Sequence, residues 1–458
     1  MDYPIFISVL FILQFICFYY GRKYSKNIQT NEDYFLANKE LRFFPLLMTF
    51  LATQVGGGLV LGSAEEAYTY GWIVLCYPMG AALGLLALAG GIGKRLAKLP
   101  VSTVAQIFEV YYGSKTLKKI ASSLSILSLF MIFVAQIIAS QKFMLSLGAI
   151  NPIWFFGFWG IVIVYTSLGG MRAVVATDII QAAFFITVFV FCFAWVVLKG
   201  DVSPATIVQN MTANENFSPA SGKFLGWLLM PLLFMVIEQD MAQRCFAGKT
   251  PKIVSRAALF AAIGTIGITI IPVFFGVLAK EMGLVVPQGV SVLIYTIMQT
   301  STPAITAIVS CAIIVAIVST ADSLINAVSS NISQDFIPQN KSIRFSQVLS
   351  GMIAVLGIIC SFYFDNIVDL LIQSYELSVS CLLVPVTLAL FLKRNTFWPA
   401  AGAILFGAFS FFFFRVYPMS LPKEIVSIAL SLAGFGLGML CQQRAAEDNL
   451  IPRDTSET

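Results

Sequence analysis

A short polar motif inside a long apolar segment holds the side chains most able to do chemistry. Residues 316–323 read AIVSTADS. A hydroxyl pair followed by a carboxylate offers the hard oxygen ligands that a small cation prefers. A carboxylate at the centre of a membrane helix costs about 2.5–3.5 kcal/mol to insert, so it is usually paired or functional. Back-bonding to the preceding helical turn, or an ordinary interhelical hydrogen bond, would explain the hydroxyls alone.

The composition leaves few other reactions open. The 458-residue chain has no histidine, which removes histidine-based acid–base catalysis, Ser-His-Asp triads and histidine metal sites. Its eight cysteines are dispersed and form no CxxC pair, so we expect free thiols within apolar segments. The stretch nearest to a phosphate-binding loop, LALAGGIGKRL, lacks the first glycine and the hydroxyl residue after the lysine. We therefore expect a protein that is not an enzyme.

The elements that must position these side chains are membrane-spanning helices. Hydrophobic residues make up 58% of the chain and charged residues only 11%, whereas a soluble domain carries about 25% charged residues. The apolar runs are continuous and lack the period-two alternation of a barrel. We predict an all-α membrane protein with about thirteen transmembrane helices, near residues 4–20, 41–70, 72–93, 118–147, 152–169, 176–198, 223–240, 256–280, 302–333, 343–362, 365–391, 396–416 and 422–441.

The distribution of Lys and Arg predicts the orientation of the chain. Basic residues gather on alternate loops, for example Arg22, Lys94 and Lys249, and the positive-inside rule makes those loops cytoplasmic. The N-terminus is then outside and the C-terminus inside the cell membrane. Because topology explains the net charge of +5, we expect no nucleic-acid partner. Asp2 stands where a signal peptide would be positive, so we expect the first segment to be a retained helix.

Two predicted helices carry residues that interrupt a helix. The second contains the triplet Gly56–Gly58, and the seventh, five segments later, contains Pro231. Paired interruptions in corresponding places of two halves point to a transporter built from inverted repeats, although small residues also serve helix packing. A break at the triplet would free the carbonyls near Ala52 and Val55, and with the hydroxyls of 319 and 320 these would form a sodium cage.

Four spaced motifs resemble those of the sodium:solute symporter family. They are NEDYFLANKEL, YTSLGGMRAVVATDIIQ, EQDMAQRCFAGKTPK and AIVSTADSLINAVSSNISQDF, and the match runs in order over roughly residues 30–395. The resemblance implies the leucine-transporter-like inverted repeat of five plus five helices, with one helix before it and two after it. The implied division is 1–40 for the first helix and loop, 41–391 for the core, 392–441 for two further helices and 442–458 for a cytoplasmic tail.

The resemblance also implies where sodium binds. The family's main sodium site falls on the carbonyls of Ala52, Val55 and Ala316 and the hydroxyls of Ser319 and Thr320. A second site, present in some members, falls on the set Asp178, Ser319 and Ser323, with Asp322 standing where those members have a serine. Two acids near one ion either raise its affinity, or one of them stays protonated because like charges repel, so the sodium stoichiometry stays open. Asp178 also fits a helix N-cap.

Among the branches of the family, the motifs look most like the high-affinity choline transporters. Glu376 stands where that branch has an acid, whereas the tryptophans of its cation–π cage correspond to Gln54, Phe133 and Glu238. Tyr77 is either an outer gate residue or an interfacial aromatic. The substrate-binding candidates are therefore Gln54, Tyr77, Phe133 and Glu376. The acids at 238 and 240, with Arg244, form either an interfacial ion-pair cluster or an inner gate.

We expect a secondary active symporter that imports a small polar organic solute together with Na⁺ by alternating access. Choline or another quaternary ammonium is the alternative substrate. A proton-coupled carrier would use an aspartate such as Asp178 or Asp322, and a transporter-like sensor would need a signalling domain that we do not expect here. The other expected partner is membrane lipid, and we expect a monomer or weak oligomer.

Overall fold

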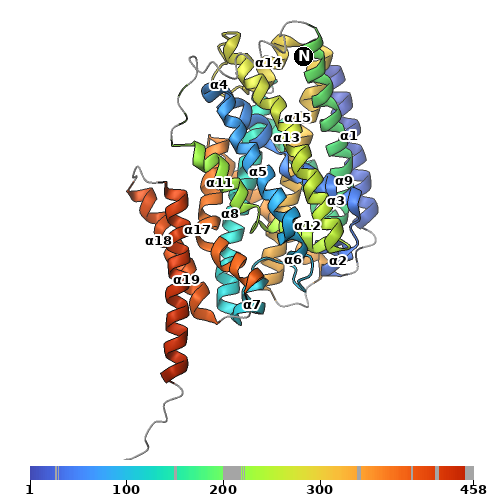
Figure 1. Ribbon diagram of the computed structural model, residues 1–458. Coiled ribbons are helices and arrows are strands. Elements are labelled where there is room, and N and C mark those ends of the chain that lie inside the picture. Colours follow the sequence, from blue (N-terminus) through green and yellow to red (C-terminus); the bar gives the residue numbers. More distant parts are fainter. Residues whose placement is uncertain are drawn as a thin grey trace, which may run out of the picture.

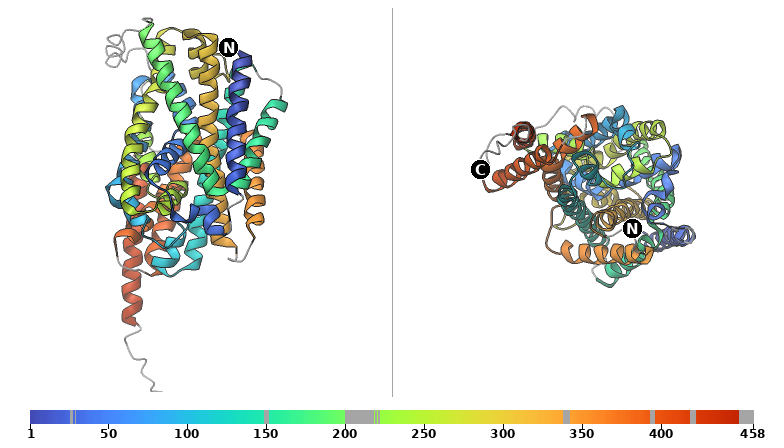
Figure 2. Two further views of the ribbon diagram at one scale, coloured as in Figure 1. Left: turned by 90° about the vertical axis from the view of Figure 1, so that its right-hand side faces the viewer. Right: turned by 90° about the horizontal axis from the view of Figure 1, so that it is seen from below.

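The computed structural model describes residues 1–25, 28, 30–148, 152–199, 218, 220, 222–337, 342–392, 396–417 and 422–448. Long helices run side by side through it, and over these residues the chain forms no strand (Figures 1 and 2). The first half contains α1 (Tyr3–Ser25), α2 (Asn31–Leu36), η1 (Ala37–Lys39), α3 (Phe43–Gln54), η2 (Gly58–Gly62), α4 (Ser63–Tyr70), η3 (Gly71–Leu75), α5 (Cys76–Ala87), η4 (Leu88–Ile92), α6 (Gly93–Leu96), α7 (Gln106–Tyr112), α8 (Lys115–Ser146) and α9 (Pro152–Leu198).

The second half repeats the alternation of long and broken helices. It contains α11 (Phe224–Phe234), α12 (Gln239–Ala247), α13 (Pro251–Glu281), α14 (Val292–Thr300), α15 (Pro303–Asn331), η5 (Ile332–Phe336), α16 (Ile343–Ser361), α17 (Ile367–Phe391), α18 (Phe397–Val416) and α19 (Lys423–Asp448). The last two helices lie at the edge of the bundle, and α1 lies at another edge (Figure 2).

The predicted thirteen passes agree with these helices. Eleven helices of the described chain are long and apolar enough to cross a membrane. Two of the eleven contain a chain reversal or break at a glycine with positive φ, at Gly71 (φ 72°) and at Gly170 (φ 54°). Gly71 separates the second pass from the third, and Gly170 separates the fifth from the sixth. The short apolar helix α3 supplies the first half of the second pass.

Both predicted interruptions are present. Helix α3 ends at Gln54, and Val55 has φ −88° and ψ 73° before the chain turns helical again. Helix α11 ends at Phe234, and Glu238 is extended, with φ −66° and ψ 125°, before α12 begins. Pro231 lies inside α11, so the second break falls one turn after the proline. The carbonyls and N–H groups at each break leave the helical ladder and become available to other partners.

The sixth pass begins earlier than the sequence predicted. Its helix resumes directly after Gly170, so Asp178 lies two turns inside it, fully buried. The N-cap interpretation of Asp178 is therefore wrong, because an N-cap residue precedes the helix. At the other end of the chain α19 continues to Asp448, so the predicted tail starts as helix. Residues 449–458 of that tail lie outside the described residues.

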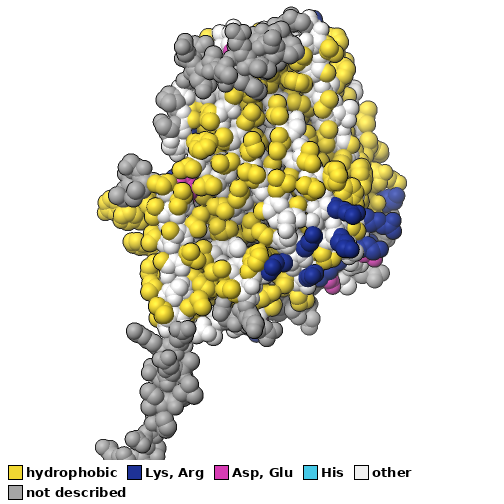
Figure 3. Space-filling view, viewed as in Figure 1, with side chains coloured by type: hydrophobic (Ala, Val, Ile, Leu, Met, Phe, Trp, Pro, Cys, Tyr) yellow, Lys and Arg dark blue, Asp and Glu magenta, His cyan; other side chains and the backbone are white. Residues whose placement is uncertain are grey.

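Charged side chains are confined mainly to one end of the surface seen in Figure 3. The sides of the molecule are largely hydrophobic, and Lys and Arg gather at the end where Figure 1 places α2, α6 and α12. Exposed basic residues there include Arg42, Lys94 and Lys249. The N-terminus lies at the opposite end (Figure 1). This is the charge separation expected of a multi-pass membrane protein.

Candidate functional site

The hydroxyl pair of α15 lies against the first helix break. Ser319 Oγ donates to the carbonyl of Ala52 at 2.8 Å, and Thr320 Oγ1 lies 2.9 Å from the carbonyl oxygen of Thr53 and 3.2 Å from that of Ala52. The carbonyl of Ala316 lies 2.9 Å from Ser319 Oγ. These buried oxygens are neutral and converge from two helices. Such a set suits a small hard cation once the hydroxyls turn their lone pairs inward.

Glycine allows the broken backbone to come this close. A Cβ added to Gly56 would overlap Thr320 Oγ1 and would lie 2.8 Å from Gln136 Oε1 of α8. The N–H of Gly57, released by the break, donates to Gln136 Oε1 at 2.7 Å. Val55 is fully buried at the same break. The triplet therefore weakens the helix and also removes the side chains that would hold α3 away from α15.

The residues predicted for a second sodium site are divided between three places: Ser319 lies at the first break, Asp322 faces α9, and Asp178 and Ser323 lie beside Arg244. Arg244 of α12 inserts its guanidinium between two of them: Nη2 lies 2.6 Å from Ser323 Oγ and 3.5 Å from Asp178 Oδ2. Thr49 donates to the same Asp178 oxygen and accepts from Arg244 Nε at 2.9 Å. The arginine is 1% exposed. A built-in cation therefore lies beside two of the residues that the resemblance assigns to a second sodium ion.

Asp322 faces a different helix from its neighbours in the motif. Its two carboxylate oxygens accept from Tyr165 Oη, at 2.9 Å, and from Thr166 Oγ1, both on α9. Its side chain is fully buried, and among the described residues it makes no ion pair at 4 Å or less. Asp322 is thus not among the oxygens that meet at the first break.

A small cavity lies between the two helix breaks. Its volume is about 30 Å³. Two of the substrate-binding candidates, Gln54 and Tyr77, line it. Thr53 and Thr320 line both this cavity and the hydroxyl–carbonyl cluster. The complete lining is Thr53, Gln54, Gly56, Gly58, Leu59, Tyr77, Ile132, Gln136, Glu238, Asp240, Thr320, Leu324, Leu371 and Tyr375.

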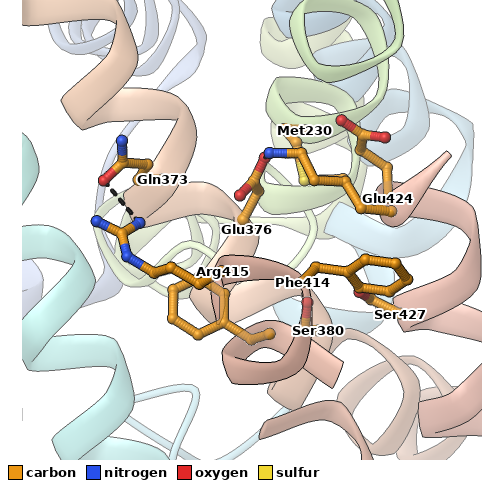
Figure 4. Close-up of a pocket in the computed structure, with 10 residues that line it drawn as sticks. Met230, Gln373, Glu376, Ser380, Phe414, Arg415, Glu424 and Ser427 are labelled. Carbon is orange, nitrogen blue, oxygen red and sulfur yellow. Dashed lines mark hydrogen bonds and ion pairs between the residues drawn. The ribbon is translucent and has the colours of Figure 1, made fainter. Parts of the chain in front are cut away.

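Two other substrate candidates lie outside this cavity. Phe133 is buried against Trp159 of α9, with ring centroids 5.9 Å apart. Glu376 points into a separate cavity of about 110 Å³ between α11, α17, α18 and α19 (Figure 4). There it pairs with Lys423 at 2.6 Å, while Arg415 donates to Gln373 at 2.9 Å. These charges already have partners, and the second cavity lies at the periphery.

Sequence reasoning missed three side chains of the site. Gln136 and Tyr375 line the central cavity, and Arg244 fills the space beside Asp178. A glutamine in the middle of an apolar helix was the available signal for Gln136, since such a group needs a hydrogen-bond partner. Arg244 had been assigned to an interfacial or gate cluster because it follows the seventh pass closely, but a long side chain can reach back into the core.

The comparison with protein families agrees with this geometry. The model of the sodium:solute symporter family matches residues 34–407, which include both helix breaks and the hydroxyl pair. The chain belongs to the sodium:solute symporter family. The name of the family describes carriers that move a solute together with sodium.

Individual relatives are distant. The sodium/pantothenate symporter of Haemophilus influenzae is 28% identical over 185 residues, which are 39% of this chain and 37% of that one. The sodium/proline symporter of the same organism is 25% identical over 479 residues, which cover 94% of this chain and 93% of that one. Three of the curated relatives are matched over 37%, 32% and 43% of their own lengths.

The fold is that of known transporters. A substrate-bound, outward-open sialic acid symporter aligns with a TM-score of 0.76 at 18% identity, covering 95% of this chain and 97% of that chain. At this identity the likeness concerns the fold alone. The symporter fold found here is the leucine-transporter-like arrangement, in which two halves each begin with an interrupted helix.

Proposed function

We propose that this symporter imports a small polar organic solute together with sodium. The observation that carries the proposal is the meeting of the α3 break with α15. Carbonyls of Ala52 and Thr53 and hydroxyls of Ser319 and Thr320 surround one point. On this proposal the carbonyls of Val55 and Ala316 complete the cage. Sodium there joins an interrupted helix of the first half to a helix of the second half.

The proposed mechanism couples the two ligands through these halves. The central cavity adjoins the hydroxyl–carbonyl cluster, and Thr320 belongs to both. Sodium bound in the cage fixes the course of the broken backbone from which Gln54 faces the cavity. Rocking of one half against the other then opens the cavity to the opposite side of the membrane.

The orientation we propose places the basic end of the molecule in the cytoplasm and the N-terminus outside. A cation that enters gains about 2.3 kcal/mol for each 100 mV of inside-negative potential. This corresponds to roughly 40-fold accumulation of solute for each net charge moved, since about 1.4 kcal/mol is a factor of ten.

The test is binding by the purified protein. Thermal unfolding is followed in sodium chloride and in potassium chloride, with choline, betaine, proline, pantothenate or sialic acid added. We expect sodium to raise the midpoint, and one class of solute to raise it further only when sodium is present. An equal midpoint in both salts, with and without every solute, would refute sodium coupling.

A proton-coupled carrier is the second candidate, and one observation favours it. Asp322 is buried, accepts two hydroxyl hydrogen bonds and makes no ion pair at 4 Å or less within the described residues. A carboxyl of this kind can exchange a proton during a transport cycle. In proteoliposomes, uptake that persists without sodium, follows a proton gradient and is lost in Asp322→Asn would favour protons. Uptake that needs sodium in both proteins would exclude them.

A further inference from the structure

The second helix break brings two acids into the central cavity. Glu238 is the extended residue that ends the break, and Asp240 lies in the first turn of α12. Both line the cavity, and their side chains are nearly buried, at 8% and 1% exposure. Their two carboxyl groups share one small cavity. Two acids so near to each other repel unless a proton or another cation lies with them.

The protein does not supply that cation as an ion pair. Neither acid has a Lys or Arg partner at 4 Å or less in the described part of the chain, and the lining of the cavity includes no basic residue. Arg244 is on the same helix, but its guanidinium binds Asp178, Ser323 and the backbone carbonyl of Asp240. The lining of the cavity therefore holds two acids and no basic side chain, in a place shielded from water where a charge without a partner is costly.

The rest of the lining can contact both the hydrocarbon part and the charged group of a solute. Tyr77 and Tyr375 form one wall, with Leu59 and Leu371 beside them. The ring of Tyr375 is held by stacking on Phe234, with centroids 4.7 Å apart and planes 26° apart. Aromatic faces attract cations and also pack against methylene groups. An inorganic ion would make no use of these rings.

We propose that the central cavity binds a small organic cation that has at least one N–H group and no carboxylate. This inference rests on the proposed function and deepens it. The ammonium or guanidinium group donates to Glu238 and Asp240, and the carbon skeleton lies along Tyr77 and Tyr375. A zwitterion or an anion would bring a carboxylate into a cavity whose own acids repel it. A quaternary ammonium would lack hydrogens for the two carboxyl groups.

The size of the cavity sets a limit on the solute. About 30 Å³ has room for roughly two water molecules. The solute therefore has few heavy atoms, or it enters a conformation in which the two breaks have moved apart. A molecule as small as methylamine fits the first condition, whereas ethanolamine, putrescine and agmatine need the second.

The experiment compares amines with neutral molecules of the same shape. Purified protein in sodium chloride is titrated with ethanolamine, putrescine or agmatine, and in parallel with ethylene glycol, 1,4-butanediol, choline, proline or betaine. We expect at least one of the three amines to raise the unfolding midpoint, and the diols, choline, proline and betaine to leave it unchanged. If none of the amines binds, or if any of the five comparison solutes binds as well as the amines, the inference is wrong.

Two variants locate the effect. Glu238→Gln and Asp240→Asn keep the shape of each side chain, and each should weaken amine binding by about tenfold or more, as expected for a charge-assisted hydrogen bond. Glu376→Gln, an acid that pairs with Lys423 outside the cavity, should bind amines as the parent does. A cooperative unfolding transition in potassium chloride reports that each variant is folded. Unaltered amine affinity in both cavity variants would overturn the inference.

The outcomes separate this inference from the proposed function. Sodium stabilisation together with binding of proline or a diol would keep sodium symport and reject the organic cation. Loss of sodium stabilisation, with retained amine binding, in a folded Glu238→Gln would make the acid pair an ion site and would also reject it. If the parent protein binds amines equally in sodium and potassium, the cation site stands and sodium coupling fails.

Discussion

Two oxygen clusters lie one helical turn apart on α15 and differ in the cation that they hold. At the first, Ser319 and Thr320 face backbone carbonyls released by the glycine-rich break, and within the described residues no charged side chain is bonded to them. At the second, Ser323 and Asp178 receive the guanidinium of Arg244. The second cluster has a permanent cation, whereas the first is open to a cation from outside on the function that we propose. Similar hydroxyls would then serve ion exchange in one place and structure in the other.

The largest expected effect is a loss of stability when the permanent cation, Arg244, is replaced. Arg244→Met would leave Asp178 buried without its partner, and removing one member of a buried pair costs about 3–5 kcal/mol. Adding Asp178→Asn to the same protein should recover most of that loss. Thermal or denaturant unfolding of the three purified proteins measures it. If the double variant is no more stable than Arg244→Met, the pairing is not what Arg244 contributes.

A smaller effect is expected at the exchangeable cluster. Thr320→Ala removes a hydroxyl that bridges α15 to the carbonyls of Ala52 and Thr53, and it should raise the half-saturating sodium concentration by about tenfold or more. Ser319→Ala should act in the same direction. Thr187→Ala, at an exposed threonine of α9, is the matched control. Sodium affinity equal to the parent's in both cage variants would refute the cage.

The comparison also predicts the number of ions moved. Because Arg244 already neutralises the cluster at Asp178, we expect one sodium ion for each solute molecule. Parallel measurement of labelled sodium and labelled solute uptake into proteoliposomes gives this ratio. A ratio of two would mean that Arg244 leaves its place during transport and that a second ion takes it.

The smallest expected effect tests whether the two clusters act independently. Asp178→Asn changes a side chain that is not among the cage oxygens, so the half-saturating sodium concentration should stay within about twofold of the parent's. Stability should fall at the same time, because Arg244 loses its counter-charge. A sodium affinity that falls as far as in Thr320→Ala would merge the two clusters into a single ion site.

The sequence predicted helices and breaks better than it predicted side-chain partners. Apolar runs and glycines act locally, so thirteen passes and the break at Gly56–Gly58 could be read directly. Pro231 indicated the second interrupted helix but not its position, because a proline disturbs the turn before it, while the chain leaves α11 at the turn after it.

Which side chains contact each other depends on two properties that the spacing of residues along the sequence does not show. The rotation of each helix about its axis turns Phe133 toward Trp159 and Glu376 toward Lys423, away from the central cavity. The reach of a long side chain brings Arg244 from α12 to Ser323. The hydroxyls at 319 and 320 were easier to predict, because their short side chains can only contact what lies directly against their own helix face.

Thr53 and Thr320 form a wall common to the proposed sodium cage and the central cavity. A shared wall makes the influence of the two ligands mutual: the factor by which sodium tightens the solute must equal the factor by which the solute tightens sodium. Sodium titrations without the solute would therefore understate the affinity that operates during transport. A substitution in this wall should change both titrations together, whereas one at Glu238 should alter the solute curve first.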